Sequence, residues 1–257
     1  MKQEIFLYLI GTAGSGKSTL TASLHSWFSM QGLDSIMVNL DPGAENLAYE
    51  PDVDIRDWIS LKETMETYEL GPNGAQIACA DMIALNSEDV KESITSFKSD
   101  YIIVDTPGQL ELFVFRESGK YMVEFLQPQR SVICYLLDPI LARSPSGFTS
   151  QLLLSLTTHF RLSQPHINVL SKSDLLTNED VETIKQWAAD PDELYGAIIN
   201  ESASVYREVS EGIVHLLQEY GGHTLLIPTS QNEQKGVEDI YTALQLQFSG
   251  GEDTLKD

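Results

Sequence analysis

The chain has 257 residues, of which 42% are hydrophobic, so it is long enough and apolar enough to form a sizeable globular core. Its 38 acidic and 16 basic residues give a net charge of −22, which disfavours direct binding of DNA or RNA. This charge is typical of a highly soluble surface, and a preference for a basic protein partner is the alternative. The sequence contains no run of about 18 apolar residues and no secretion signal, so we expect no membrane span and a cytoplasmic location.

Six apolar runs predict strands. Most are near-continuous in Val, Ile and Leu, the pattern of strands that are buried on both faces. Helical patterns separate them, so we expect an α/β fold: a mostly parallel, doubly wound sheet with helices on both sides. A ligand of such a sheet binds beyond the carboxyl ends of the strands. The expected strands cover residues 4–10, 35–40, 101–104, 131–137, 166–170 and 223–227.

Two stretches of the chain exceed what a plain crossover needs. Residues 54–98 carry two or three helical segments that break at the sequence GPNG, and residues 178–220 carry further helices that break near an Asp-Pro pair. We therefore expect one domain over residues 1–248 with these two helical insertions, followed by a polar tail at residues 249–257.

Residues 11–18 read GTAGSGKS, which fits the phosphate-binding pattern G-x-x-x-x-G-K-[ST] without a mismatch. The loop lies between the first expected strand and a helix expected over residues 19–30, as phosphate binding requires. In this mechanism backbone amides surround the phosphates, Lys17 reaches the outer phosphates and the Ser18 hydroxyl faces Mg²⁺. The alternative is a glycine-rich turn with a surface lysine. The nucleotide-contacting residues expected here are Gly14, Ser15, Gly16, Lys17, Ser18 and Thr19.

Residues 101–109 read YIIVDTPGQ, an expected strand followed by a tight turn. Asp105 is placed to hold Mg²⁺, and the Gly108 amide can donate to a terminal phosphate and so sense whether that phosphate is present. The side-chain amide of Gln109 can both donate to and accept from a water molecule, and so aim the water at phosphorus. The alternative is a strand-ending turn, which these residue types also favour.

Asp41 follows the second expected strand in the sequence NLDPGAE, at the same edge of the sheet. Three roles are open for its carboxylate. It can be an outer-shell ligand of Mg²⁺, the acceptor of a proton from the attacking water, or a turn or helix-cap residue.

Residues 170–174 read LSKSD and end another expected strand. The Asp174 carboxylate can accept two hydrogen bonds from guanine N1 and N2, a pair that adenine lacks, and the aliphatic part of Lys172 can lie over the base. The motif of GTP-binding proteins usually begins with Asn or Thr, where this chain has Ser171, and that change could weaken binding or alter secondary contacts. The backbone around Thr229 could complete the base pocket. An ordinary helix N-cap is the alternative for this segment.

The tripeptide at residues 71–73 lies between the Asp41 and Asp105 motifs. Together with DTPGQLE at residues 105–111, it makes nearly the whole chain resemble the GPN-loop GTPases, with the archaeal type favoured. This family belongs to the P-loop GTPases of the signal-recognition and MinD-like group. The resemblance implies a homodimer in which the Gly-Pro-Asn loop of one subunit reaches the nucleotide of the other, so that Asn73 acts in trans. A helix–helix turn without chemistry is the alternative.

The sequence therefore predicts a Mg²⁺-dependent GTPase with a P-loop NTPase fold, which converts GTP to GDP and phosphate as a dimeric switch or assembly factor. A small-molecule phosphotransferase and a slowly hydrolysing regulatory protein are the alternatives. Eukaryotic members of the resembled family are linked to RNA polymerase assembly and transport, which suggests a protein client in the transcription machinery. The expected catalytic residues are Lys17, Asp41, Asn73 and Gln109, and the expected metal residues are Ser18, Asp41 and Asp105.

Overall fold

The structure is a computed structural model that describes residues 4–126, 129–202, 205–219, 225–230 and 235–249. Within these residues the strands form one central sheet, and all the pairings between neighbouring strands are parallel. The strands are β1 (Ile5–Gly11), β2 (Ser35–Asn39), β3 (Val53–Asp54), β4 (Tyr101–Asp105), β5 (Ser131–Leu137), β6 (His166–Leu170) and β7 (Leu226–Pro228). Their order across the sheet is β3-β2-β4-β1-β5-β6-β7.

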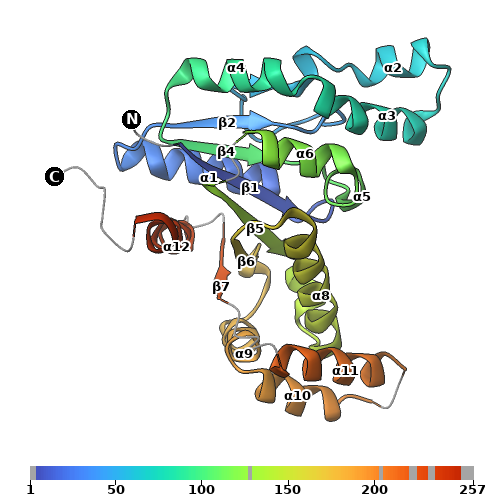
Figure 1. The fold of residues 1–257 in the computed structure, drawn as a ribbon. Coiled ribbons are helices and arrows are strands. Elements are labelled where there is room, and N and C mark those ends of the chain that lie inside the picture. The colour runs from blue at the N-terminus through green and yellow to red at the C-terminus, as the bar shows by residue number, and fades with distance from the viewer. Residues whose placement is uncertain (1–3, 127–128, 203–204, 220–224, 231–234, 250–257) are drawn as a thin grey trace.

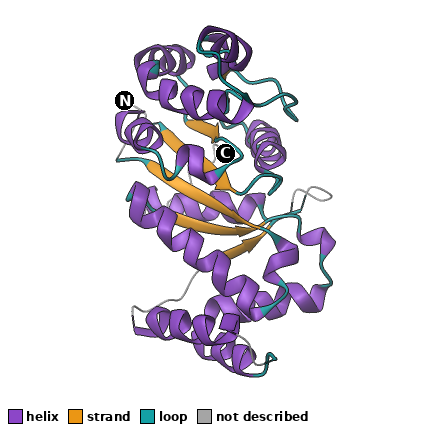
Figure 2. Cartoon of the chain, turned by 90° about the vertical axis from the view of Figure 1, so that its right-hand side faces the viewer, coloured by secondary structure: helices purple, strands orange, loops and turns teal. Residues whose placement is uncertain are grey.

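The predicted α/β fold with a doubly wound parallel sheet is confirmed, and Figures 1 and 2 show helices on both sides of the strands. Five of the expected strands agree with the observed ones to within one residue at each end. The sixth expectation, residues 223–227, begins outside the described residues, and β7 extends to Pro228. The two-residue strand β3 was not expected, because it is too short to show a hydrophobic period and forms only by pairing with the end of β2.

Apart from the last one, the described helices occupy the connections between strands, including the two long stretches noted in the sequence. Gly71 is the N-cap of α3 and Pro72 is its first residue, so the expected break at GPNG is a helix start. A second start lies at Pro191, where Asp190 caps α10. Two glycines at residues 221–222 also predict the end of a helix, and they lie outside the described residues. The helices are α1 (Lys17–Met30), α2 (Leu61–Thr67), α3 (Pro72–Leu85), α4 (Ser87–Phe97), α5 (Leu110–Phe113), α6 (Glu117–Leu126), α7 (Pro139–Ala142), α8 (Pro145–Leu162), α9 (Asn178–Ala189), α10 (Pro191–Ile199), α11 (Val205–Glu219) and α12 (Val237–Ser249).

Each face of the sheet has its own hydrophobic core. Along β1, side chains alternate between the two faces, so that Tyr8 packs into one core and Leu7 and Leu9 pack into the other. Leu24 and Phe28 of α1 cover the second face, together with residues of α12. Because both faces are covered, the strands can be apolar throughout, which explains their near-continuous Val, Ile and Leu.

The order of the strands places the phosphate-binding motif at the point where the winding of the chain reverses. Strand β1 is central, and the chain adds β2, β3 and β4 on one side of it before adding β5, β6 and β7 on the other. Connections leaving the carboxyl ends of β1 and its neighbours therefore diverge, and a crevice for a ligand opens above β1. Figure 1 shows the group α2–α3 and the group α9–α11 at opposite ends of the molecule, on either side of this point.

His166, the first residue of β6, gives the fold a dependence on pH. Its Nε2 lies 2.8 Å from Ser155 Oγ, and its ring lies against Tyr135 and 6.0 Å from the ring of His159. Burial, reinforced by the charge of His159, lowers the pKa of His166 to about 4, although a hydrogen bond with Asn168 opposes the shift. A histidine in the unfolded chain titrates near 6.5, so the unfolded chain binds the proton first as the pH falls.

We therefore expect the free energy of unfolding to fall as the pH drops from about 6.5 to about 4, by up to about 3 kcal/mol from this residue. The stabilisation is fully present above pH 6.5. Urea unfolding at several pH values measures it, and the His166→Gln variant should lose this part of the pH dependence. Equal pH dependence in the two proteins would contradict the assignment.

Candidate functional site

The phosphate-binding loop connects β1 to the first turn of α1. Gly14 and Gly16 have φ values of 73° and 96°, which only glycine adopts without strain, and these turns direct the backbone around a concave loop. Lys17 is buried, and its Nζ donates to the carbonyls of Gly11 and Thr12 at 3.0 Å each. Burial lowers the pKa of Lys17, while the nearby carboxylates of the site oppose that shift. The ammonium group therefore contacts the phosphate-binding loop itself, at the place where we expect it to contact the phosphates.

Two adjoining hollows lie beside this loop. The first, of about 390 Å³, is the P-loop hollow, and the second, of about 310 Å³, is the Asp174 hollow. Gly16, Thr19 and Lys172 line both, so the two hollows are neighbours. The P-loop hollow is also lined by the expected site residues Gly14, Lys17, Ser18, Asp41, Asp105 and Gly108. The Asp174 hollow is also lined by Ser171, Asp174 and Thr229.

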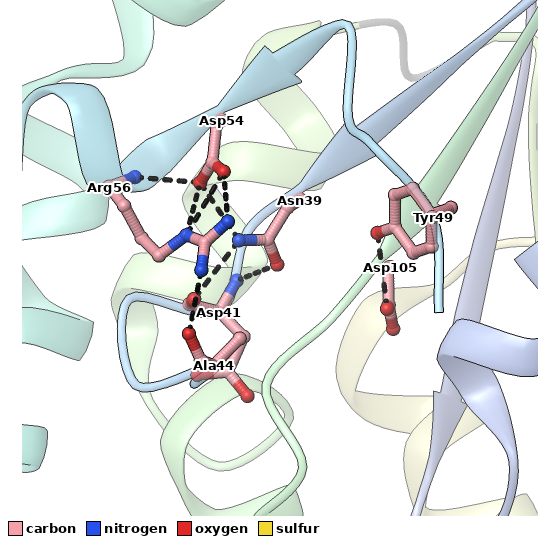
Figure 3. Close-up of polar contacts among 7 residues, drawn as sticks. All are labelled: Asn39, Asp41, Ala44, Tyr49, Asp54, Arg56 and Asp105. Atoms are coloured by element: carbon pink, nitrogen blue, oxygen red, sulfur yellow. Dashed lines mark hydrogen bonds and ion pairs between the residues drawn. The ribbon is translucent and has the colours of Figure 1, made fainter. Parts of the chain in front are cut away.

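Asp105, at the end of β4, is the buried carboxylate of the P-loop hollow. Burial raises its pKa to about 6, although hydrogen bonds from Ser18 and Tyr49 and the charge of Lys17 act in the opposite direction. The Tyr49 hydroxyl donates to Asp105 Oδ2 at 3.2 Å (Figure 3). Hydroxyl and carboxylate oxygens are the ligands that Mg²⁺ prefers, so the neighbouring side chains of Ser18 and Asp105 fit this ion. The sequence reasoning did not select Tyr49, which lies 56 residues from its partner.

Ser15 adds a second indication that the loop is built for a ligand. Its Oγ is buried and has no hydrogen-bond partner among the described residues. Buried hydroxyls are rarely left unpaired in folded proteins, so such a group points to a missing partner such as an anion or water. A Cβ atom added at Gly11 would lie 2.6 Å from this oxygen and 2.9 Å from the Leu136 carbonyl oxygen, and the fixed backbone contact explains why a glycine begins the motif.

Asp41 makes two contacts through its carboxylate. Oδ1 accepts a hydrogen bond from the Gly43 amide at 2.8 Å, which closes the turn that follows β2, and Oδ2 accepts one from the Gly108 amide at 3.2 Å. The turn role that the sequence left open is therefore present. The Gly108 amide, which we expected to face a terminal phosphate, has the carboxylate of Asp41 as its acceptor.

The Asp174 hollow is formed where β6 and β7 end. Ser171 donates through both its amide and its hydroxyl to the Leu137 carbonyl, at 3.2 and 3.1 Å, so this serine joins the end of β6 to β5. The Thr229 carbonyl accepts from the Ser173 amide at 2.9 Å, which fixes the start of the turn that carries Asp174. Asp174 itself is exposed and lines the hollow. Its carboxylate is accessible to a ligand.

Lys172 connects the two hollows. Its φ of 49° is left-handed, and its side chain crosses the phosphate-binding loop, where Nζ donates to the Gly14 carbonyl at 2.6 Å. Its carbon chain passes near Gly16, because a Cβ atom added there would lie 3.5 Å from Lys172 Cε. The side chain therefore forms the wall between the P-loop hollow and the Asp174 hollow.

Asn73 lies apart from these groups. It is exposed in the first turn of α3 and lines neither hollow, among the described residues. One turn further along α3, Gln76 accepts a hydrogen bond from Gln109 Nε2 at 3.3 Å, and both line a third hollow of about 180 Å³ beside Gly108. Sequence reasoning missed Gln76, whose only local signal is its position after the GPN tripeptide.

Arg116 forms an ion pair at the surface. Its guanidinium pairs with Asp81 of α3, with Nε 2.5 Å from Oδ1. The partner lies 35 residues away in sequence, so no local pattern reveals the pair. Together with the Gln76 contact, it connects α3 to the segment that follows Gly108 at two points.

The sequence of this chain matches a family model and several named proteins. A family model described as a conserved hypothetical ATP binding protein matches residues 9–249. GPN-loop GTPase 3 of Schizosaccharomyces pombe is 34% identical over 90% of this chain and 86% of its own length. The protein of the same name from Debaryomyces hansenii is 37% identical over 82% of this chain and 79% of its own length. The chain belongs to the GPN-loop GTPase family.

Solved structures agree with this membership. A GTPase from Pyrococcus abyssi in its apo form shares 28% identity and has a TM-score of 0.83, covering 93% of this chain and 96% of that protein. The sequence relatives described above are fungal, whereas this structural relative is archaeal, so the archaeal type stays a prediction for this GPN-loop GTPase family member. Among the helices in the described parts of the chain, none has both the length and the apolar character needed to cross a membrane.

Proposed function

We propose that this chain binds GTP with Mg²⁺ and hydrolyses it to GDP and phosphate. The observation that carries the proposal is the pair of adjoining hollows: the phosphate-binding loop lines one, the accessible Asp174 carboxylate lines the other, and Lys172 separates them. This layout matches a nucleotide with its phosphates at one end and a guanine at the other. Membership in the GPN-loop GTPase family supports the same activity, since the relatives are named as GTPases.

The residues of the P-loop hollow would bind the triphosphate. Loop amides from Gly14 to Thr19 donate to its oxygens, and Lys17 Nζ exchanges the carbonyls of Gly11 and Thr12 for the outer phosphates. Ser18 and Asp105 would hold Mg²⁺, which neutralises charge on the phosphate oxygens when bound. The loop amides, Lys17 and the bound ion would then put positive charge where negative charge increases during the reaction, and such stabilisation is the main source of catalysis in phosphoryl transfer.

Asp41 and Gln109 would act on the attacking water. When a γ-phosphate oxygen takes the Gly108 amide, Asp41 Oδ2 loses its present donor and is free to accept a hydrogen bond from water. The water oxygen forms a bond to phosphorus, the bond from phosphorus to the β–γ bridging oxygen breaks, and the proton leaves through Asp41 or the product phosphate. The Gln109 amide, now bonded to Gln76, would orient the same water.

Phosphate release from GTP tests this proposal. The purified chain should release phosphate from GTP and Mg²⁺ without any added acceptor, and chelation of Mg²⁺ should stop the release. A phosphotransferase would instead need a second substrate before GTP is consumed, and a regulatory protein would bind GTP with little turnover. Turnover that depends on a small-molecule acceptor would overturn the proposal.

We further propose a cytoplasmic homodimer of single-domain subunits that acts as a nucleotide-dependent switch or assembly factor on a protein client. The family resemblance suggests a client in the transcription machinery. The exposed position of Asn73, outside the two hollows of its own subunit, supports action on the nucleotide of the other subunit. Asn73 offers an uncharged donor, and the ring of Pro72 restricts the backbone that presents it.

Mixing two inactive variants tests the trans arrangement. Asn73→Ala and Lys17→Met should each hydrolyse GTP slowly alone, but their heterodimer has one site with both an intact phosphate-binding loop and an intact partner loop. Random mixing makes half of the dimers hybrid, so phosphate release should recover to about a quarter of the unmodified rate. If mixing restores nothing although subunits exchange, Asn73 acts within its own subunit or not at all.

A further inference from the structure

A polar network behind the Asp41 turn begins with Asn39, at the end of β2 (Figure 3). The register of β2 with β3 places Asn39 opposite Asp54. Asn39 is fully buried, and its Nδ2 donates to Asp54 Oδ1 at 2.9 Å and to the Asp41 carbonyl at 3.2 Å. Its Oδ1 accepts from the Asp41 amide at 3.0 Å. One buried side chain therefore fixes both backbone polar groups of Asp41.

Arg56 holds the other end of the same turn. Its Nε and Nη2 donate to the two carboxylate oxygens of Asp54 at 2.5–3.0 Å, and its Nη1 donates to the Ala44 carbonyl at 2.8 Å. Burial opposes the charge on Asp54, but the hydrogen bonds from Arg56 and Asn39 outweigh it and lower the pKa of Asp54. Asp54 in turn raises the pKa of Arg56. Both groups stay charged, and such paired contacts are stronger and more directional than those between neutral groups.

The turn that carries Asp41 is therefore held at both ends, by Asn39 at its start and by Arg56 at Ala44. The Asp41 carboxylate is directed to the Gly43 and Gly108 amides as a result. We propose that Arg56 is a positioning residue for GTP hydrolysis, which acts through Asp54 and Asn39 to hold the Asp41 carboxylate beside Gly108. This inference rests on the proposed function, in which Asp41 acts on the attacking water.

Arg56 does not act as a catalytic residue in this proposal. It is absent from the described residues that line the P-loop hollow, and its guanidinium is engaged by Asp54 and the Ala44 carbonyl (Figure 3). An arginine that stabilised phosphate charge directly would have to leave these partners. The expected effect of its loss is a displaced Asp41, and small displacements of a reacting group can lower rates by about 100-fold.

The first test separates positioning from binding. Arg56→Met keeps most of the length of the side chain but loses all five donors, and we expect kcat to fall about 10- to 100-fold while GTP affinity changes less than about twofold. Arg56→Lys keeps the charge beside Asp54 and should recover part of kcat. Arg207→Met is the matched control, because Arg207 pairs with Glu211 on α11, far along the chain from the turn. An unchanged kcat in Arg56→Met would overturn the inference.

The second test is a double-mutant cycle with Asp41→Asn. If Arg56 acts through Asp41, adding Arg56→Met to Asp41→Asn should lower kcat no further, whereas a general weakening of the fold would multiply the two losses. Losses that multiply would overturn the inference. The proposed role of Asp41 has its own test. If Asp41→Asn alone hydrolyses GTP at the unmodified rate, that role is wrong, whatever the result for Arg56. Thermal unfolding of each variant shows that the compared proteins are folded.

Discussion

Lys17→Met is expected to lower GTP hydrolysis by about 10²- to 10³-fold, because one preorganised positive group is removed from the developing phosphate charge. The Lys17 ammonium group is buried and donates to the Gly11 and Thr12 carbonyls. Methionine is similar in length to lysine, so its side chain can fill the same space without these hydrogen bonds. The fold should therefore survive the change, and burial already opposes the charged form of this lysine. Phosphate release at saturating GTP and titration of GTP binding measure the two parts of the effect.

Lys185→Met is the control for this prediction. Lys185 is an exposed lysine on α9 that pairs with Glu182 at 3.0 Å, and exposed pairs of this kind contribute little to stability. Its loss should leave both GTP binding and hydrolysis unchanged. Hydrolysis that survives Lys17→Met at the unmodified rate would show that the P-loop hollow is not where the phosphates react.

Asp174→Ala should remove the preference for GTP over ATP, by a factor of about 10² or more. Guanine presents N1–H and N2–H₂ donors that a carboxylate accepts as a pair, and adenine offers neither in that arrangement. Asp174 is exposed in the Asp174 hollow, and the Thr229 carbonyl fixes the turn before it, so the carboxylate is available and oriented. Competition between GTP and ATP for a fluorescent nucleotide analogue measures the preference.

Glu182→Ala is the control here, since this exposed carboxylate lies on α9 and does not line the Asp174 hollow, among the described residues. It should keep the preference for GTP. The description of the matching family model names ATP, whereas the relatives are named GTPases, so this measurement also decides between the two nucleotides. An Asp174→Ala variant that still prefers GTP would place base recognition elsewhere in the chain.

The sequence was most informative where the residues of a functional motif lie next to one another in the chain. The phosphate-binding loop, the end of β4 and the end of β6 each carry their residues within a few positions, and the structure brings Lys17, Asp41, Asp105 and Gly108 around one hollow. Continuous apolar runs gave the strands, because strands buried on both faces have a strong pattern. The roles of these residues in catalysis stay predictions.

The sequence was least informative where residues meet through the fold. Tyr49 reaches Asp105, and Asn39 meets Asp54 only because a two-residue strand pairs in one register. Arg116 pairs with Asp81, which lies 35 residues away in the sequence. No local period or turn signal encodes such contacts, since they depend on how distant elements pack. The positioning network around Arg56 belongs to this class.

In the proposed binding mode, the contact between Asp41 and the Gly108 amide would make GTP entry an anion exchange. The amide already has a negatively charged acceptor, so an arriving γ-phosphate gains only the difference between two similar hydrogen bonds, while GDP, which lacks that group, leaves the contact intact. In that binding mode, the Asp41 carboxylate would compete with the third phosphate for the Gly108 amide.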